Sequence, residues 1–306
     1  MKLRAGVLGA GAFGRIHARK YAEDARVLLV GIYDPDDERA TELANTHDVE
    51  AFASLEALIA ACDLITIASP PSFHGAAAKA ALTAGRHTLV EKPLATDAAV
   101  GAALVKLAAE NKLTLACGHQ ERLVFQAMGL LDAPERPTLI ESVREGPWTG
   151  RSADVSVTLD LMVHDLDLAL QLIKAQPAHV AATGRSEHGH TADAIEARLS
   201  FDGVEAMFRS SRVASQRRRF MRAVYPSGEV KIDFVTRAFE NTTRFPLNAN
   251  FAETRIGADP LGANVAQFID AALGVATRPV VTGTEALAVL ELALAVDAAS
   301  GLASLT

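Results

Sequence analysis

The stretch GAGAFG at residues 9–14 decides the fold of this chain. Its spacing is GxGxxG, which alone is a weak signal because small residues are common in turns. Here an apolar run, residues 5–9, leads into it and a helical pattern, residues 13–24, follows it. The order of strand, glycine turn and helix is typical of the first unit of a dinucleotide-binding fold.

The three glycines have separate tasks in such a turn. Gly9 permits the tight bend, Gly11 lets the backbone approach a pyrophosphate, and Gly14 allows close packing of the helix. Asp34 ends the second apolar run, 20 residues after Gly14, where a carboxylate would accept hydrogen bonds from an adenosine ribose. Because this carboxylate would repel a 2′-phosphate, we predict NAD rather than NADP, although Arg39 nearby could adapt the pocket. The alternative is a glycine turn without a ligand, which the combined signals disfavour.

Short apolar runs alternate with helical patterns from residue 1 to about 118. Near-continuous apolar strands joined by helical crossovers specify a parallel sheet covered by helices on both faces. We therefore predict an α/β protein whose N-terminal Rossmann domain, a doubly wound parallel sheet, spans 1–118. Strand-like stretches with few helices follow from about 138 to 245, which predicts a C-terminal α+β domain on an open mixed or antiparallel sheet over 119–306. Two late helices are expected near 261–275 and 284–299.

The composition excludes several kinds of partner. With 306 residues, of which 49% are hydrophobic, the chain can form two cores. A formal net charge of −7 argues against a nucleic-acid partner, and no apolar run approaches the ~18 residues of a membrane helix. Cys62 and Cys117 lie far apart beside apolar runs, so we expect buried thiols and a reducing, cytoplasmic setting.

Charged residues stand at the end of the fifth predicted strand, in the motif Glu91-Lys92-Pro93, and Ser69-Pro70-Pro71 ends the fourth. Ligands of open α/β sheets bind beyond the carboxyl ends of the strands. Lys92 is therefore expected to face the cofactor crevice, where a neighbouring cationic ring disfavours the ammonium form and readies the amine for proton exchange. A salt bridge between Glu91 and a solvated Lys92 explains the two residues equally well.

A second polar pattern lies in the later half of the chain. Residues 159–174 predict a helix on which Asp160, His164, Asp167 and Gln171 share one stripe. The Asp160 carboxylate can hold one ring nitrogen of His164 and leave the other for proton exchange. A stripe that faces water is the open alternative. We predict no metal, because no third or fourth ligand has a matching spacing.

Three strings, GAGAFGRIHA, IASPPSFH and LVEKPLA, resemble in order and separation the Gfo/Idh/MocA family of sugar and polyol oxidoreductases. The resemblance implies a nicotinamide cofactor, a catalytic lysine at Lys92 and a cis bond between Lys92 and Pro93. It also implies that residues of these motifs contact the cofactor: Gly9, Gly11, Phe13, Gly14, Arg15, Asp34, Ser69, Pro70, His74, Glu91 and Lys92.

The resemblance continues beyond the first domain. The family pattern D-x-G-x-H-x-x-D falls on Asp160, Met162, His164 and Asp167, with methionine in place of glycine, and implies that Asp160 and His164 are catalytic. GHQER at 118–122, IESVR at 140–144 and the segment from 151 are similar to a subgroup that acts on nucleotide-linked amino sugars. Candidates to bind a substrate diphosphate are then Arg122, Arg144 and Arg151, although structural ion pairs explain each of them as well.

Together these residues predict an NAD-dependent dehydrogenase that removes a hydride from a secondary alcohol of a sugar. Lys92 would bind the hydroxyl, and His164, held by Asp160, would exchange the proton. Two alternatives stay open: a dehydrogenase of a free sugar or polyol such as inositol, and an NAD-binding regulatory protein without turnover, which the proton-handling residues disfavour. The resemblance also implies a homodimer or homotetramer formed through an exposed sheet face.

Overall fold

The structure is a computed structural model that describes residues 2–302. The chain divides into two compact units. The first contains residues 1–120 and 259–288, and the second contains 121–258 and 289–306, so the division falls inside one late helix.

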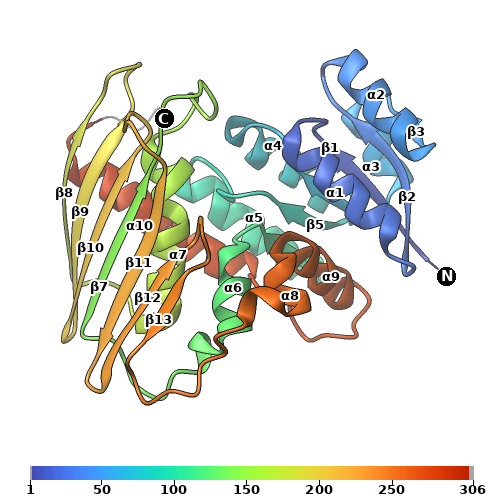
Figure 1. The fold of residues 1–306 in the computed structure, drawn as a ribbon. Coiled ribbons are helices and arrows are strands. Elements are labelled where there is room, and N and C mark those ends of the chain that lie inside the picture. Colours follow the sequence, from blue (N-terminus) through green and yellow to red (C-terminus); the bar gives the residue numbers. More distant parts are fainter. Residues whose placement is uncertain (1, 303–306) are drawn as a thin grey trace. The chain divides into compact units, whose positions relative to one another are not determined.

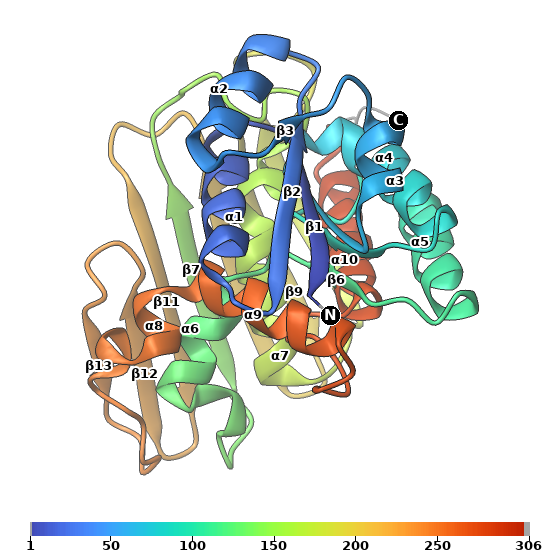
Figure 2. The same ribbon diagram turned by 90° about the vertical axis from the view of Figure 1, so that its right-hand side faces the viewer.

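The first unit is a six-stranded parallel sheet in the order β3-β2-β1-β4-β5-β6. Its strands are β1 (Leu3–Leu8), β2 (Val27–Tyr33), β3 (Glu50–Ala51), β4 (Leu64–Ile67), β5 (His87–Val90) and β6 (Leu115–Cys117). The helices are α1 (Ala12–Glu23), α2 (Asp37–His47), α3 (Leu55–Ala61), α4 (Pro71–Thr83), α5 (Ala98–Glu110), α9 (Pro260–Ala272) and the start of α10 (Gly283–Ala299). Figure 2 shows α1 and α2 on one face of the strands and α3, α4 and α5 on the other, which confirms the predicted doubly wound fold.

The late helix α9 belongs to this first unit, whereas the expected division at residue 118 placed it in the second domain. Its apolar side chains Val265, Phe268 and Ile269 are buried in the same core as Tyr21 of α1 and Val27 of β2. An apolar stripe must be buried somewhere, and here it covers α1 rather than the second sheet. The two predicted late helices are confirmed as α9 and α10.

The second unit contains a seven-stranded mixed sheet in the order β13-β12-β11-β7-β10-β9-β8. Only β7 and β10 pair in parallel; the other neighbours are antiparallel. The strands are β7 (Leu139–Glu145), β8 (His179–Arg185), β9 (Ala194–Phe201), β10 (Val204–Ser211), β11 (Arg218–Tyr225), β12 (Gly228–Asp233) and β13 (Phe239–Asn241). The helical elements are α6 (Glu121–Met128), η1 (Leu130–Asp132), η2 (Thr158–Met162), α7 (Val163–Ile173), η3 (Phe251–Glu253) and α8 (Arg255–Ala258).

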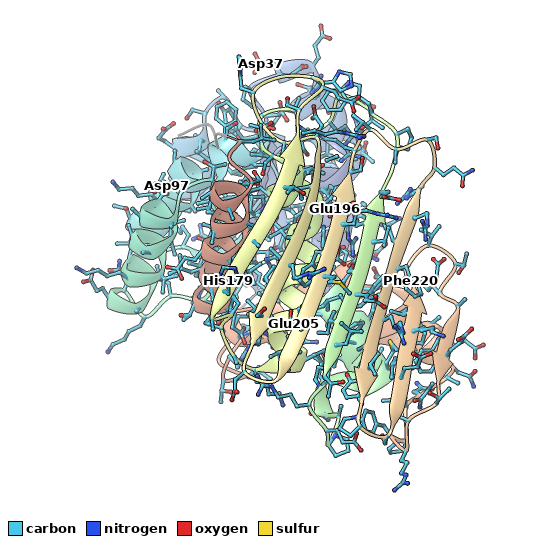
Figure 3. The ribbon with its side chains drawn as sticks, turned by 90° about the vertical axis from the view of Figure 1, so that its left-hand side faces the viewer. Asp37, Asp97, His179, Glu196, Glu205 and Phe220 are labelled. Carbon is cyan, nitrogen blue, oxygen red and sulfur yellow. The ribbon has the colours of Figure 1, made fainter. Side chains whose placement is uncertain are left out.

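Within this unit, helices cover one face of the sheet, as the helices beside the strands in Figure 1 show. The covered face carries buried side chains such as Ile140, Ala206 and Phe208. Along each strand, these side chains alternate with side chains that point to the opposite face. Figure 3 looks onto this opposite face, where Glu196, Glu205 and Phe220 are labelled.

Two further expectations concern the chain as a whole. Among residues 2–302, no helix combines the length and the apolar character needed to cross a bilayer. Cys62 and Cys117 are both buried and form no disulfide in this part of the chain. Burial raises the pKa of the Cys62 thiol to about 12. The expected cytoplasmic setting stays a prediction.

Candidate functional site

The strands of the first sheet end at a common edge. Leu8 is level with Tyr33 and with Ile67, and Val90 is level with Ile67 and with Cys117. The residues that directly follow these ends include the glycine turn, Asp34, Ser69 and Glu91-Lys92. The register therefore gathers the predicted cofactor residues of this unit at one sheet edge, where ligands of such folds bind.

The glycine turn has the geometry that a pyrophosphate requires. Gly9 has φ +100°, and a Cβ there would lie 2.6 Å from the carbonyl oxygen of Ala68. A Cβ at Gly14 would lie 1.7 Å from the carbonyl oxygen of Gly9, so only glycine lets α1 pack on the turn. A Cβ at Gly11 would meet nothing within 4 Å. The backbone at Gly11, where α1 begins, is thus open to an anion.

Asp34 lies directly beside this turn. Its carboxylate accepts hydrogen bonds from the backbone N–H of Ala10 at 2.7 Å and from that of Asp36 at 2.9 Å. The two bonds fix the acid at the end of β2, next to the first turn of α1. This is the position from which a carboxylate reaches an adenosine ribose in dinucleotide-binding folds.

The carboxylate of Glu91 is buried and already bonded. His17 Nε2 lies 2.7 Å from Glu91 Oε1, and Gln120 donates to the same oxygen at 3.3 Å. Burial raises the pKa of Glu91, but the bond to His17 and the charges of His17, Lys92 and His74 outweigh it, so the net pKa is lowered. A Cβ at Gly118 would lie 2.6 Å from this carboxylate. Glu91 therefore organises the end of β5 from inside the protein.

His74, expected among the cofactor contacts, is buried and bonds the backbone instead. Its Nδ1 lies 2.7 Å from the carbonyl oxygen of Pro93, and its Nε2 lies 2.9 Å from that of Ser69. Burial lowers the pKa of His74, and a neutral imidazole has one N–H, so the ring donates to one of these two carbonyl oxygens. The bond between Lys92 and Pro93 is cis, as expected, and Lys92 is partly exposed.

The remaining motif residues of the first unit have mixed surroundings. Phe13 is partly buried and packs against the core around α1. Arg15 forms an exposed ion pair with Glu42 at 2.7 Å. Ser69 is partly exposed and Pro70 is exposed, at the start of α4. These positions leave the two residues at the sheet edge accessible to a ligand.

The predicted helix over 159–174 is not regular, because it begins with the π-helical turn η2 and becomes α-helical only at Val163. π turns inside helices are frequent at functional sites. Asp160 and His164, on either side of this change, are partly exposed, while Met162 is buried. Ser156 anchors the start of the turn, since its hydroxyl donates to Asp297 Oδ2 at 2.6 Å.

The arginine candidates separate into buried and exposed members. Arg122 is 2% exposed and pairs with Asp167, which is therefore not part of an open stripe. Arg144 is 1% exposed and pairs with Asp165 at 2.9 Å and with Glu121. Burial lowers the pKa of Arg144, but the two carboxylates raise it more. The alternative of structural ion pairs therefore accounts for both arginines.

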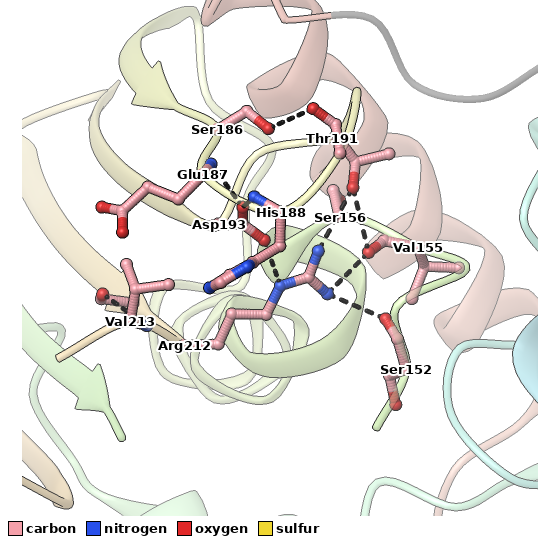
Figure 4. Close-up of polar contacts among 12 residues, drawn as sticks. Ser152, Val155, Ser156, Ser186, Glu187, His188, Thr191, Asp193, Arg212 and Val213 are labelled. Atoms are coloured by element: carbon pink, nitrogen blue, oxygen red, sulfur yellow. Dashed lines mark hydrogen bonds and ion pairs between the residues drawn. The ribbon is translucent and has the colours of Figure 1, made fainter. Parts of the chain in front are cut away.

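Arg151, by contrast, is exposed on the segment between β7 and η2. A buried cluster around Arg212 holds this segment (Figure 4). Arg212 donates to the carbonyl oxygens of Ser152 at 2.8 Å and Val155 at 2.9 Å and to Asp193 Oδ1 at 2.6 Å. Arg212 also lies over the ring of Trp148, 5.0 Å from its centroid. The residues on both sides of Arg151 are thus anchored to Arg212, which directly follows β10.

Several of these contacts were not predicted from the sequence. They involve His17, Gln120, Arg212 and Asp193. His17 and Gln120 lie inside strings that resemble the family, but their common partner Glu91 is far away in sequence, so no local period links them. Arg212 and Asp193 belong to no recognised motif, and their opposite charges alone did not predict that they form a pair.

Comparisons with known proteins extend these observations. A family model described as "Oxidoreductase family, NAD-binding Rossmann fold" matches residues 3–119, and the model of the GFO/IDH/MocA C-terminal domain matches 130–230. The chain is 36% identical over 310 residues to UDP-N-acetylglucosamine 3-dehydrogenase of Acidithiobacillus ferrooxidans, across 97% of this chain and 98% of the relative. The superposition on the solved structure of that enzyme covers 98% of each chain, with a TM-score of 0.88 and 35% identity.

Two further relatives are more distant. Inositol 2-dehydrogenase of Rhizobium meliloti is 28% identical over 196 residues, which are 60% of this chain and 58% of the relative. The WlbA dehydrogenase of Bordetella pertussis, solved in complex with NADH and UDP-GlcNAcA, has a TM-score of 0.86 at 21% identity, across 98% of this chain and 96% of that chain. The latter likeness shows a shared fold.

Proposed function

The chain belongs to the Gfo/Idh/MocA family of oxidoreductases, and from this premise we propose that it is an NAD-dependent dehydrogenase of a UDP-linked amino sugar, UDP-N-acetylglucosamine. The observation that carries the proposal is the 36% identity to UDP-N-acetylglucosamine 3-dehydrogenase along 97% of this chain. Similarity over the full length includes both the cofactor unit and the unit that carries Asp160 and His164.

The residues of the first unit fit NAD. The open backbone at Gly11 suits a pyrophosphate, and Asp34 beside the turn suits a ribose with a free 2′-hydroxyl. A 2′-phosphate would meet the charge of Asp34, so NAD is favoured over NADP. Hydride acceptance is the chemistry that NAD supplies when bound.

The protein itself manages one proton in this reaction. Lys92 binds and polarises the substrate hydroxyl, and an imidazole nitrogen of His164 removes the proton as the carbon is oxidised. Asp160 holds one ring nitrogen of His164 and leaves the other for this proton exchange. Partial exposure of all three side chains supports these roles.

Arg151 binds the diphosphate of the substrate in this proposal. It is exposed, whereas Arg122 and Arg144 are enclosed in ion pairs and instead hold α6, α7 and β7 together. A guanidinium matches the geometry of a phosphate with two parallel N–H donors. The anchoring of Ser152 and Val155 by Arg212 limits the freedom of the segment that carries Arg151.

A free polyol such as inositol is the second candidate substrate. The similarity to inositol 2-dehydrogenase of Rhizobium meliloti favours it, but that similarity covers only 60% of this chain. A polyol has no diphosphate, so it would leave Arg151 without a role in binding.

Turnover of defined substrates tests the proposal. We expect NADH absorbance to appear with UDP-N-acetylglucosamine and NAD, and mass spectrometry to show a product that has lost two hydrogen atoms. Lys92→Ala and His164→Ala should each lower kcat by about 10²-fold to 10⁴-fold, as expected for loss of a general acid or base. Lys79→Ala and His47→Ala, at positions outside the motifs, are the matched controls.

The outcomes separate the candidates. Turnover of inositol or another free polyol, with none of the UDP-sugar, would refute the substrate assignment. Absence of turnover across the panel, with NAD binding intact, would favour a regulatory protein. An Arg151→Ala variant with an unchanged KM for the UDP-sugar would contradict the role given to that arginine.

A second copy of this chain is the proposed protein partner. The outer face of the second sheet presents half-exposed Val143 and Phe220 in one row with the charged Arg209 and Glu196 (Figure 3). Two apolar side chains beside two opposite charges suit a twofold interface, in which each copy offers the same face. The homodimer or homotetramer implied by the family is therefore proposed to form through this face.

A further inference from the structure

Lys92 follows a residue whose side chain is held by a buried histidine of α1. Glu91 Oε1 lies 2.7 Å from His17 Nε2, and His17 has no exposed surface. Gln120 donates to the same oxygen, and Gly118 leaves just enough room for the carboxylate. The position of Glu91 is thus determined from one face of the sheet.

Lys92 precedes a residue whose backbone is held by a second buried histidine, this time from α4. His74 lies between the carbonyl oxygens of Pro93 and Ser69, at 2.7 and 2.9 Å, and is 1% exposed. Ser69 follows β4 and Pro93 follows β5, so the buried ring fills the space between two neighbouring strand ends and donates its N–H to one of them. α4 covers the face of the sheet opposite to α1.

The strand ladder alone does not hold this segment. The last ladder bond near Lys92 runs from the Glu91 N–H to the carbonyl oxygen of Ile67, and proline at 93 has no N–H to offer. Beyond Glu91, the contacts with His74 supply the constraint that the sheet no longer provides.

We propose that His17 and His74 are positioning residues for Lys92. His17 holds Glu91, the residue before it, and His74 contacts Pro93, the residue after it. The inference rests on the catalytic role proposed for Lys92. Proton exchange depends on the distance between the amine and the substrate hydroxyl, and a displacement of ~1 Å can cost about 10²-fold in rate. Each histidine acts through the backbone or side chain of a neighbour rather than by contact with the substrate.

Substitution of either histidine tests whether it positions Lys92. In His74→Ala and His17→Ala we expect kcat to fall by about tenfold to a hundredfold, with the NAD dissociation constant unchanged. Glutamine should restore part of the rate at both positions, because its amide can donate one of the lost hydrogen bonds. His87→Gln is the matched control: His87 also lies in this unit, where its Nδ1 accepts the Thr114 N–H at 3.0 Å.

A double-mutant cycle distinguishes positioning from general stabilisation. When Lys92 is already alanine, adding His74→Ala should leave the small residual rate unchanged, since there is no amine left to position. A histidine that only supports the fold would lower the rate by the same factor in both backgrounds. Equal factors in the two backgrounds would therefore overturn the proposal.

Chemical labelling supplies a readout that needs no substrate. The rate of Lys92 acetylation by acetic anhydride, followed by peptide mass spectrometry, should change in His17→Ala and His74→Ala, where the amine is no longer held in place, but not in His87→Gln. Identical rates in the wild type and all three variants would refute the positioning role, even if the variants had lost activity. If the wild type turns over nothing, the proposed function fails, while the labelling result still decides whether the histidines position Lys92.

Discussion

At the scale of single residues, Asp34 sets the expected choice between two cofactors. Its carboxylate is fixed beside the glycine turn by the N–H groups of Ala10 and Asp36. We expect Asp34→Asn to lower kcat/KM for NAD and to raise the NADP-to-NAD ratio by at least about tenfold, which corresponds to ~1.4 kcal/mol. Steady-state kinetics with both cofactors measure the ratio. Asp36→Asn, which keeps an N-cap for α2, is the control, and an unchanged ratio in Asp34→Asn would contradict the assignment.

Glu91 links a buried residue to the pH dependence of stability. Burial alone would raise its pKa, but the bond to His17 and the nearby positive charges make the net pKa lower than usual. A lowered pKa means that ionised Glu91 stabilises the fold above the ordinary carboxyl pKa, and that this contribution is lost as the pH falls through the lowered value.

We therefore expect Glu91→Gln to be less stable than the wild type at pH 7 by about 1–3 kcal/mol. The difference should stay constant above the ordinary carboxyl pKa of about 4.5 and shrink as the pH falls below it, since only the wild type loses a charge interaction there. Urea unfolding at a series of pH values measures the difference. A difference that also stays constant below this pKa would show that the charge of Glu91 is not stabilising.

At the scale of elements, a single arginine directly after β10 holds the segment that leads into η2. Arg212, just beyond β10, connects buried Asp193 to the carbonyl oxygens of Ser152 and Val155. Asp193 also accepts the N–H groups of Glu187 and His188 at 2.6 and 2.7 Å. Burial raises the pKa of Asp193, but these bonds and Arg212 outweigh it and lower the pKa. One ion pair thus orders two separate loops.

Removing this arginine should therefore destabilise the second unit. We expect Arg212→Met to cost about 3–5 kcal/mol, because Asp193 is left as a buried charge without its partner. Arg185→Met, which breaks the exposed pair with Glu187 in the same unit, should cost at most about 1 kcal/mol. Urea unfolding of both variants checks the contrast, and equal losses would refute it. The KM for the UDP-sugar should rise only in Arg212→Met.

At the scale of the whole molecule, the outer face of the second sheet is the surface through which we propose that two copies of the chain associate. Phe220 lies opposite Val143 in the ladder, and both are half-exposed. We expect Phe220→Asp to produce monomers in sedimentation experiments, because a charge in the apolar row would be buried without a partner. Val275→Asp, at an apolar residue that is 75% exposed elsewhere, should leave the assembly unchanged. A wild-type monomer at micromolar concentration would contradict the proposed interface.

Much of the fold could be predicted because its signals are local. Apolar runs and helical patterns need only neighbouring residues, and so they located most strands of both sheets, while the short β3 and β13 were not predicted. The widened turn at Asp160 was not predicted, since a π-helical turn preserves the apolar character that indicates a helix. The packing of α9 on α1 was also missed, because an apolar stripe shows that a helix is covered but not by which element.

For the candidate site, the sequence by itself determined which residues stand at strand ends and turns: the glycines at 9, 11 and 14, Asp34, Ser69 and Lys92. Backbone geometry and residue type suffice there, because register places all parallel strand ends at one edge. Only the tertiary structure decided the partners of the charged and ring-bearing side chains. Glu91 bonds to His17, His74 lies between two backbone carbonyls, and Arg122 and Arg144 are enclosed by acids. The reason is that a buried polar group must be satisfied by whatever the fold brings next to it, and that neighbour is distant in the chain.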